Sequence, residues 1–244
     1  MANGIGARAA AGVAGVAALM LTATLAACTG GGSSSSAASA SGSSTNDVPS
    51  GKQLNAILLT AADLPHDFTE ESVGAQNSGA KLSSAASAVN LSSADCNTVL
   101  NLVNTVGQNS LGEASYASDA FTPPSGLGEF DETLLEFHGT DATAFTNKLG
   151  AALNRCSTFQ ASDASGATQS ASVKVIPGPR VGDESVGFTV KVAIGNQTMV
   201  MNGAAIRVGT AVAVIDNSLL QGQNTEIDLT KLAGVLVPRM RSLH

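Results

Sequence analysis

The feature that most constrains the fold is a run of strictly alternating residues from Ser185 to Ile194. Val, Phe and Ile occupy every second position, and Ser, Gly, Thr, Lys and Ala occupy the positions between them. A period of two is typical of a β-strand with one buried face. Gly195-Asn196 is typical of a two-residue hairpin turn, and Gly209-Thr210 marks a second turn. The pattern therefore predicts three consecutive antiparallel strands, at residues 185–194, 197–208 and 211–216.

Four other segments have the apolar spacing of amphipathic helices. They are residues 50–59 with Ser50 as the cap, a segment capped by Ser92 or Ser93 that includes Val103, a segment opened by Thr140-Asp141 that ends near Cys156, and residues 225–240. Proline lacks a backbone N–H and clashes with the preceding turn. We therefore expect Pro238 to kink or shorten the last helix.

The remaining segments predict the fold class. Further strands are expected near residues 67–76, 113–122 and 129–138, whereas residues 161–172 are interpreted as a long polar loop. Strands joined by short turns predict an antiparallel sheet, and helices that lie apart from the strands predict an α+β fold. Residues 51–244 contain no repeat and no second linker. A single α+β domain is therefore expected there, an antiparallel β-sheet with helices packed against it.

The N-terminal region has the pattern of an export signal. Residues 1–27 contain one charged side chain, Arg8, before a run of small and aliphatic residues, which is typical of a signal peptide. The run ends in Leu25-Ala26-Ala27-Cys28, which resembles a bacterial lipobox. The resemblance implies cleavage before Cys28 and attachment of diacylglycerol to its sulfur, and it leaves acylation of the new amino group open. The alternative is a plain transmembrane helix from Ala9.

Residues 28–50 are predicted to form a lipidated cysteine and a disordered tether. Residues 29–50 are rich in Gly and Ser and contain one charge, Asp47, and one large apolar residue, Val48. Nothing in the segment offsets the entropy lost on ordering it. The formal charge of -7 argues against a nucleic-acid partner. We therefore expect a domain held by its lipid on the extracytoplasmic face of the cell membrane.

Two of the three cysteines remain once Cys28 is assigned to the lipid. A cysteine pair in an exported domain is typical of a disulfide, and Cys96 and Cys156 each lie on the apolar face of a predicted helix. The alternative is a catalytic or redox thiol, which requires a neighbouring base or a CxxC motif, and neither is visible in the sequence. A disulfide between Cys96 and Cys156 that joins two helices is therefore predicted.

The sequence contains no recognisable catalytic motif. The GxSxG, HExxH, Walker, GxGxxG and EF-hand patterns are missing, and the three histidines lack metal-binding spacing. Adjacent acids occur at Glu70-Glu71, Asp131-Glu132 and Asp183-Glu184. Neighbours on a strand face opposite ways, so we interpret these pairs as solvated. No catalytic residue, metal or cofactor is predicted, and the protein is expected not to be an enzyme.

One loop is a candidate ligand rim. The segment Pro177–Glu184 combines two prolines and two glycines with both signs of charge, directly before the alternating strand. The rim residues are predicted to be Arg180, Asp183 and Glu184. A structural alternative is an ion pair between Arg180 and Asp183 that stabilises the turn. Arg207 alternates with apolar neighbours and is expected to face solvent or the open side of the sheet.

Five motifs also occur in an order and spacing that resemble a known family. They are LLTAADLP at 58–65, ADC at 94–96, the Phe145–Cys156 helix closing on Phe159, VGDES at 181–185 and IRVG at 206–209. Over about residues 54–240 they resemble the extracytoplasmic sensor domain of PknH-type receptor kinases and related sensor-domain lipoproteins of high-GC Gram-positive bacteria. The resemblance implies an antiparallel sheet with packed helices, a disulfide and a cleft for a small ligand. Those kinase sensors carry two disulfides, whereas this chain can form one, and it lacks a kinase domain.

The function favoured by these patterns is a lipid-anchored, non-catalytic binding or sensor module for an unidentified small ligand or envelope component. The alternatives are a carrier of apolar cell-envelope molecules, a hydrolase with an unrecognised site, and a purely structural protein. The cleft lining distinguishes the first two, because polar residues such as Arg180 and Asp183 favour a polar ligand. A tunnel of Val, Leu and Ala side chains favours a lipid instead.

Overall fold

The computed structural model describes most of the region predicted to be globular. The described residues are 48–65, 67–71, 75–77, 90–91, 94–104, 112–126, 128–162, 168–223 and 227–244. The predicted signal peptide, Cys28, nearly all of the predicted tether and His66 lie outside these ranges. Within them, no helix has both the length and the apolar character needed to cross a membrane.

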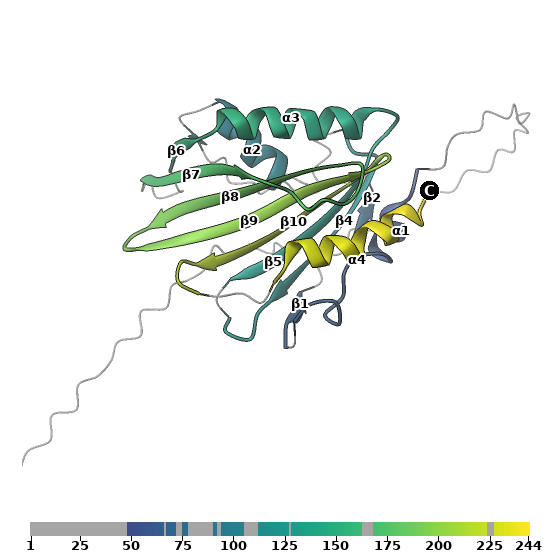
Figure 1. Ribbon diagram of the computed structural model, residues 1–244, viewed down its shortest axis with the longest axis horizontal. Helices are drawn as coiled ribbons and strands as arrows, with labels where there is room; N and C mark the ends of the chain where they lie inside the picture. Colours follow the sequence, from purple (N-terminus) through teal and green to yellow (C-terminus); the bar gives the residue numbers. More distant parts are fainter. Residues whose placement is uncertain are drawn as a thin grey trace, which may run out of the picture. The chain divides into compact units, whose positions relative to one another are not determined.

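One antiparallel sheet forms the centre of the domain (Figure 1). Among the described residues its order is β1-β4-β5-β10-β9-β8-β7-β6-β3, and β2 also pairs with β4. The strands are β1 (Thr69–Glu71), β2 (Ala75–Asn77), β3 (Asn90–Leu91), β4 (Ser115–Thr122), β5 (Glu129–Glu136), β6 (Thr158–Ser162), β7 (Thr168–Ile176), β8 (Glu184–Ile194), β9 (Gln197–Val208) and β10 (Ala211–Leu220). All the described pairings are antiparallel. The predicted α+β class is therefore confirmed.

Helices pack against both faces of the sheet (Figure 1). On one face, here called the α3 face, lie α2 (Ala94–Asn104) and α3 (Asp141–Arg155). On the other, the α4 face, lie α1 (Gly51–Asn55) and α4 (Leu229–Arg241). Each face buries its own apolar core, as expected for a sheet between two helical layers.

The strand alternation decides which side chain enters which core. In β8, Phe188 and Val190 are buried in the core of the α3 face, while Thr189 and Lys191 point the other way. The Phe188 ring lies directly over Gly203 of β9, where a Cβ atom would be 2.3 Å from the ring Cζ. Glycine at position 203 therefore makes room for the largest side chain of the alternating strand.

One predicted loop is wrong. Most of residues 161–172 belong to strands, because β6 extends to Ser162 and β7 begins at Thr168. In β7, Ala171 and Val173 are buried while Ser170 is exposed. Short Ser, Ala and Thr side chains give little hydrophobic contrast, so the period of two was not visible in the sequence.

The expected shortening of the last helix at Pro238 is also wrong. Helix α4 continues through Pro238 to Arg241. Pro238 itself is exposed, but Val237 and Met240 beside it are buried in the core of the α4 face. The burial of these neighbours stabilises the last turn against the cost of the proline.

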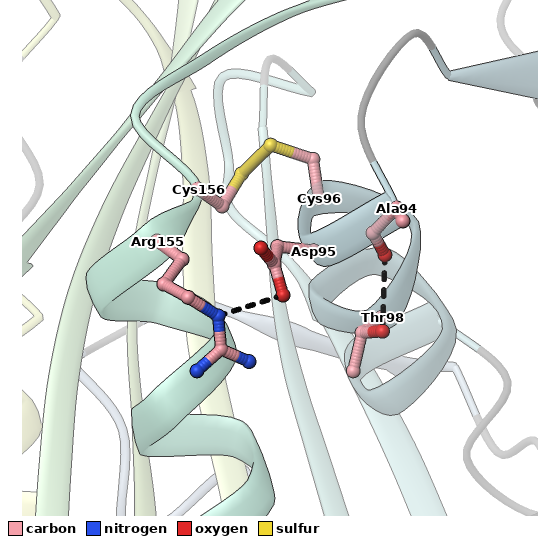
Figure 2. The surroundings of a disulfide bond; sticks show 6 residues. All are labelled: Ala94, Asp95, Cys96, Thr98, Arg155 and Cys156. Atoms are coloured by element: carbon pink, nitrogen blue, oxygen red, sulfur yellow. Dashed lines mark hydrogen bonds and ion pairs between the residues drawn. A yellow bond between two sulfur atoms is a disulfide. The ribbon is translucent and has the colours of Figure 1, made fainter.

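A disulfide joins α2 to the residue that follows α3 (Figure 2). The sulfur atoms of Cys96 and Cys156 are 2.06 Å apart, and both residues are buried in the core of the α3 face. Beside the bond, Arg155 Nε lies 2.9 Å from Asp95 Oδ1, and these side chains are 60% and 37% exposed. Exposed pairs contribute little stability, so the disulfide and the shared core of the α3 face, rather than this ion pair, hold α2 against α3.

Candidate functional site

A polar cavity of about 650 Å³ lies at one end of the central strands β8, β9 and β10. Four segments meet there: the start of α3, the loop before β8, the turn between β9 and β10, and the end of α4. We call it the Arg207 cavity, and it is lined by Gly139, Thr140, Thr143, Asp183, Arg207, Val208, Gly209, Thr210, Arg241 and His244. Its volume is within the range of small-molecule sites.

Arg207 holds two acids at this cavity. Its Nη1 atom is 3.3 Å from Asp183 Oδ2, and its Nε atom is 3.4 Å from Glu184 Oε2. Its side chain is 18% exposed, so the expectation that it faces solvent or the open side of the sheet is wrong. Glu184 is directly opposite Arg207 in the β8–β9 ladder, and cross-strand neighbours of opposite charge attract.

The alternative interpretation of the loop, an ion pair between Arg180 and Asp183, is also wrong, because Asp183 pairs with Arg207 instead. Asp183 faces Arg207, while Arg180 is exposed and does not line the cavity. Spacing along the chain suggested Arg180 as the partner, because it lies three residues away. The tertiary fold instead brings in Arg207 from 24 residues further along.

Further hydrogen bonds connect the loop before β8 to its neighbours. The Gly209 N–H donates to Asp183 Oδ2 at 2.7 Å, and the Asp183 N–H donates to the Arg207 carbonyl at 2.8 Å. Thr146 Oγ1 of α3 donates to Glu184 Oε2 at 2.9 Å. The two acids therefore fix the loop, the turn and α3 in one arrangement.

The start of α3 contributes Gly139, Thr140 and Thr143 to the cavity lining. Thr140 is the N-cap residue, but its side chain makes no capping hydrogen bond. The first N–H groups of a helix lack intrahelical partners and carry partial positive charge. Arg207, Arg241 and Asp183 line the same cavity, so its lining carries both signs of charge.

A buried carboxylate lies next to the same cavity. Glu136 is almost completely buried, and its Oε2 atom is 3.6 Å from His244 Nε2. Burial raises the pKa of Glu136, although a hydrogen bond from Thr210 and the nearby His244 and His138 act in the opposite direction. Thr210 and His244 both line the cavity, so the polar character of the site continues into the sheet.

Asp131 and Glu132 are not the solvated pair that the sequence suggested. They do face opposite ways, because Asp131 is opposite Asp216 on the α3 face and Glu132 is opposite Asp119 on the α4 face. Glu132 and Asp216 are buried, and Glu132 Oε2 accepts the Leu59 N–H at 2.8 Å. In the described part of the chain, Glu132 Oε1 and Asp216 Oδ1 have no hydrogen-bond partner.

These acids have strongly raised pKa values. Burial, followed by repulsion from Glu129 and Glu71, raises the pKa of Asp131 to about 7. Burial also raises the pKa of Glu132 to about 8 and that of Asp216 well above its ordinary value. No three or more His, Cys, Asp or Glu residues in the described ranges form a group able to hold a metal ion.

The structure thus brings together only part of the predicted rim. Asp183 lines the cavity, Glu184 lies next to it, and Arg180 stays outside. Sequence reasoning missed Arg241 and His244 because they come from the far end of the chain. The Thr140-Asp141 helix start was the one local signal for the remaining polar lining.

The comparisons with known proteins identify the fold. No protein-family model matches the chain, and no curated protein matches it. The extracellular domain of PknH from Mycobacterium tuberculosis is similar in structure, with a TM-score of 0.60 and 14% identity, over 80% of this chain and 98% of that one. The Rv0999 ortholog from Mycobacterium smegmatis has a TM-score of 0.43 and 12% identity, over 80% of this chain and 97% of that one. The chain therefore has the fold of the extracellular domain of PknH.

Proposed function

We propose that the protein is a lipid-anchored, extracytoplasmic binding or sensor module that holds a small polar ligand in the Arg207 cavity. The observation that carries the proposal is the cavity itself, in which polar groups from four distant segments converge. The fold of an extracellular domain and the lipobox at Cys28 support the location outside the membrane.

The lining favours a polar ligand over a lipid. Apart from glycines, Val208 is its one apolar residue, and the other side chains are hydroxyls, charged groups and an imidazole. A carrier of apolar molecules needs a wall of aliphatic side chains, because each buried methylene contributes about 0.8 kcal/mol. The polar groups are also held in place before binding by the network around Arg207, which reduces the entropy lost when a ligand is bound.

The proposed function is non-catalytic. Arg207 pairs with both Asp183 and Glu184, and these contacts hold the loop before β8 to the turn between β9 and β10. The three side chains therefore have a positioning role. A broad panel of hydrolase substrates is expected to show no turnover by the purified protein. Turnover that survives rigorous purification would contradict this part of the proposal.

A pair of arginine variants tests the location of the ligand. Arg241→Gln removes an exposed guanidinium that lines the cavity, and Arg180→Gln removes one that does not. Ligands from a panel of small polar metabolites are expected to raise the melting temperature of the wild type and of Arg180→Gln. The shift should be smaller in Arg241→Gln, because losing a charged hydrogen bond weakens binding by about tenfold or more.

Three outcomes of this experiment count against the proposal. Equal shifts in all three proteins would place the ligand elsewhere. A loss confined to Arg180→Gln would return the site to the loop tip that the sequence suggested. Co-purification of a lipid with the native protein, together with no response to polar compounds, would favour the carrier of apolar molecules.

Lipid attachment is tested at Cys28. Cys28→Ala is expected to leave the precursor unprocessed and without acyl mass, because the thioether forms on the cysteine sulfur. Thr29→Ala, which keeps the cysteine, is the matched control and should be lipidated. Intact mass spectrometry of membrane-extracted protein measures both, and a wild type without diacylglycerol would contradict the anchor.

A further inference from the structure

A second polar surface lies on strands β6, β7 and β8, on the face opposite to α3. The ladders place Thr158 opposite Ser172, Ser172 opposite Lys191, and Lys174 opposite Thr189. The residues between them, such as Ala171 and Val173, are buried in the core of the α3 face. Helix α4 packs on β9 and β10, and the exposed Lys174 and Lys191 show that the surface beside it is open to solvent.

A cavity of about 520 Å³ is formed on this surface. Its polar lining consists of Thr158, Gln160, Ser170, Ser172, Lys191 and Thr198. Gln160 Nε2 donates to Ser170 Oγ at 2.9 Å, and Thr189 Oγ1 donates to Asn202 Oδ1 at 2.8 Å in the neighbouring row. A cross-strand hydrogen bond therefore holds Gln160 and Ser170 of the lining in place before any ligand arrives.

The surface is positively charged on an otherwise acidic chain. The chain has a formal charge of -7, yet Lys174 and Lys191 are diagonal neighbours on β7 and β8, close enough for long side chains to act together. Among the described residues of β6 to β9, Glu184 is the single acid. It lies at the other end of β8 and contacts Thr146 of α3, so it does not neutralise the lysines.

We infer that this surface binds a water-soluble phosphate-bearing molecule, at a site separate from the Arg207 cavity. Two ammonium groups match the two negative charges of a phosphate monoester, and lysine and hydroxyl side chains are common phosphate ligands. The hydroxyl and amide groups around Ser172 provide further hydrogen bonds for the polar remainder of the ligand. A soluble source is favoured over a lipid headgroup, because Phe159 is buried and the aliphatic residues of the lining are alanines.

Calorimetric titration of the detergent-extracted full chain with glucose 6-phosphate tests the inference. Binding is expected for the wild type and for a control with Lys148→Gln and Lys231→Gln, which removes two exposed lysines of α3 and α4. The variant with Lys174→Gln and Lys191→Gln should bind about tenfold more weakly or worse. Added salt should weaken the wild-type binding, because exposed charges are screened, and glucose itself should not compete.

Each of the other outcomes would overturn the inference. Equal affinity in the wild type and the Lys174 and Lys191 variant would remove these residues from the site. No binding of glucose 6-phosphate or inorganic phosphate at millimolar concentration would remove the site itself. Binding only to micelles that contain phosphatidylglycerol would assign a lipid headgroup instead. Binding that survives in the lysine variant but is lost in Arg241→Gln would assign the phosphate to the Arg207 cavity.

Discussion

The free energy of unfolding is expected to fall by several kcal/mol between about pH 5 and about pH 8. The pKa of Asp131 is raised to about 7 and that of Glu132 to about 8, in both cases mainly by burial. The unfolded chain releases these protons near the ordinary values of 3.8 and 4.5. Rising pH therefore favours the unfolded state until it passes the folded-state pKa values, and the domain should be most stable in mild acid.

The surroundings of these acids support the sign of the effect. On the α3 face, burial and then repulsion from Glu129 raise the pKa of Asp131, and burial and then repulsion from Asp131 and Glu129 raise that of Asp216. On the α4 face, burial raises the pKa of Glu132, and repulsion from Asp119 and Asp63 raises it further. The hydrogen bond from the Leu59 N–H and the charge of Arg239 lower it, but by less. Asp63 has a lowered pKa, because hydrogen bonds from Thr60 and Arg239 outweigh its burial. The stability that ionised Asp63 contributes is lost only when the pH falls below the ordinary pKa of 3.8. Asp63 therefore does not change the fall in unfolding free energy above pH 5.

Asp216→Asn is the variant that tests this directly. The amide resembles the protonated acid in shape, so the substitution should have little effect near pH 5 and should stabilise the domain near pH 8. Asp67→Asn is the matched control, because Asp67 is exposed and its φ of 72° is one that asparagine tolerates. Urea unfolding at both pH values measures the difference.

Two results would contradict the prediction. One is a wild type of equal stability at both pH values. The other is an Asp216→Asn variant that loses stability near pH 8, which would mean that the ionised carboxylate has a favourable partner. Glu132→Gln on the opposite face provides an independent repeat of the measurement.

Removal of the disulfide is the second large expected effect. Cys96 and Cys156 are separated by 60 residues. Closing a loop of this length lowers the conformational entropy of the unfolded chain and so raises its free energy by about 4 kcal/mol. The variant with Cys96→Ala and Cys156→Ala should therefore melt roughly 10 °C lower. Differential scanning calorimetry measures the shift, and non-reducing peptide mapping of the wild type should recover one species that joins the two cysteines.

Arg155→Gln is the control for the disulfide experiment. It removes the exposed ion pair with Asp95 between the same two helices and should change the stability by less than about 1 kcal/mol. If the cysteine variant melts at the wild-type temperature, the bond does not restrict the unfolded chain. Free thiols on both cysteines, trapped before lysis of the native cells, would show that the bond is not formed there.

The local pattern of apolar residues and turns was sufficient to predict many of the strands and helices. The alternation from Ser185 to Ile194 and the Gly195-Asn196 turn predicted β8 and its return strand, because a period of two and a short turn are properties of adjacent residues. Helical spacing likewise placed Cys96 and Cys156 on apolar faces, which is where the structure joins them. Where small side chains reduce hydrophobic contrast, as from Thr168 in β7, the same reasoning failed.

The sequence by itself determined the strand and helix periods, the disulfide partners and the acidic edge of the candidate site at Asp183. The tertiary structure alone decided that Asp183 faces Arg207, that Glu132 is buried, and that Arg241 and His244 reach the same cavity. The physical reason is that periodicity specifies the face on which a side chain lies. The residue it meets there depends on which distant strand pairs in which register, and on which helix covers that face.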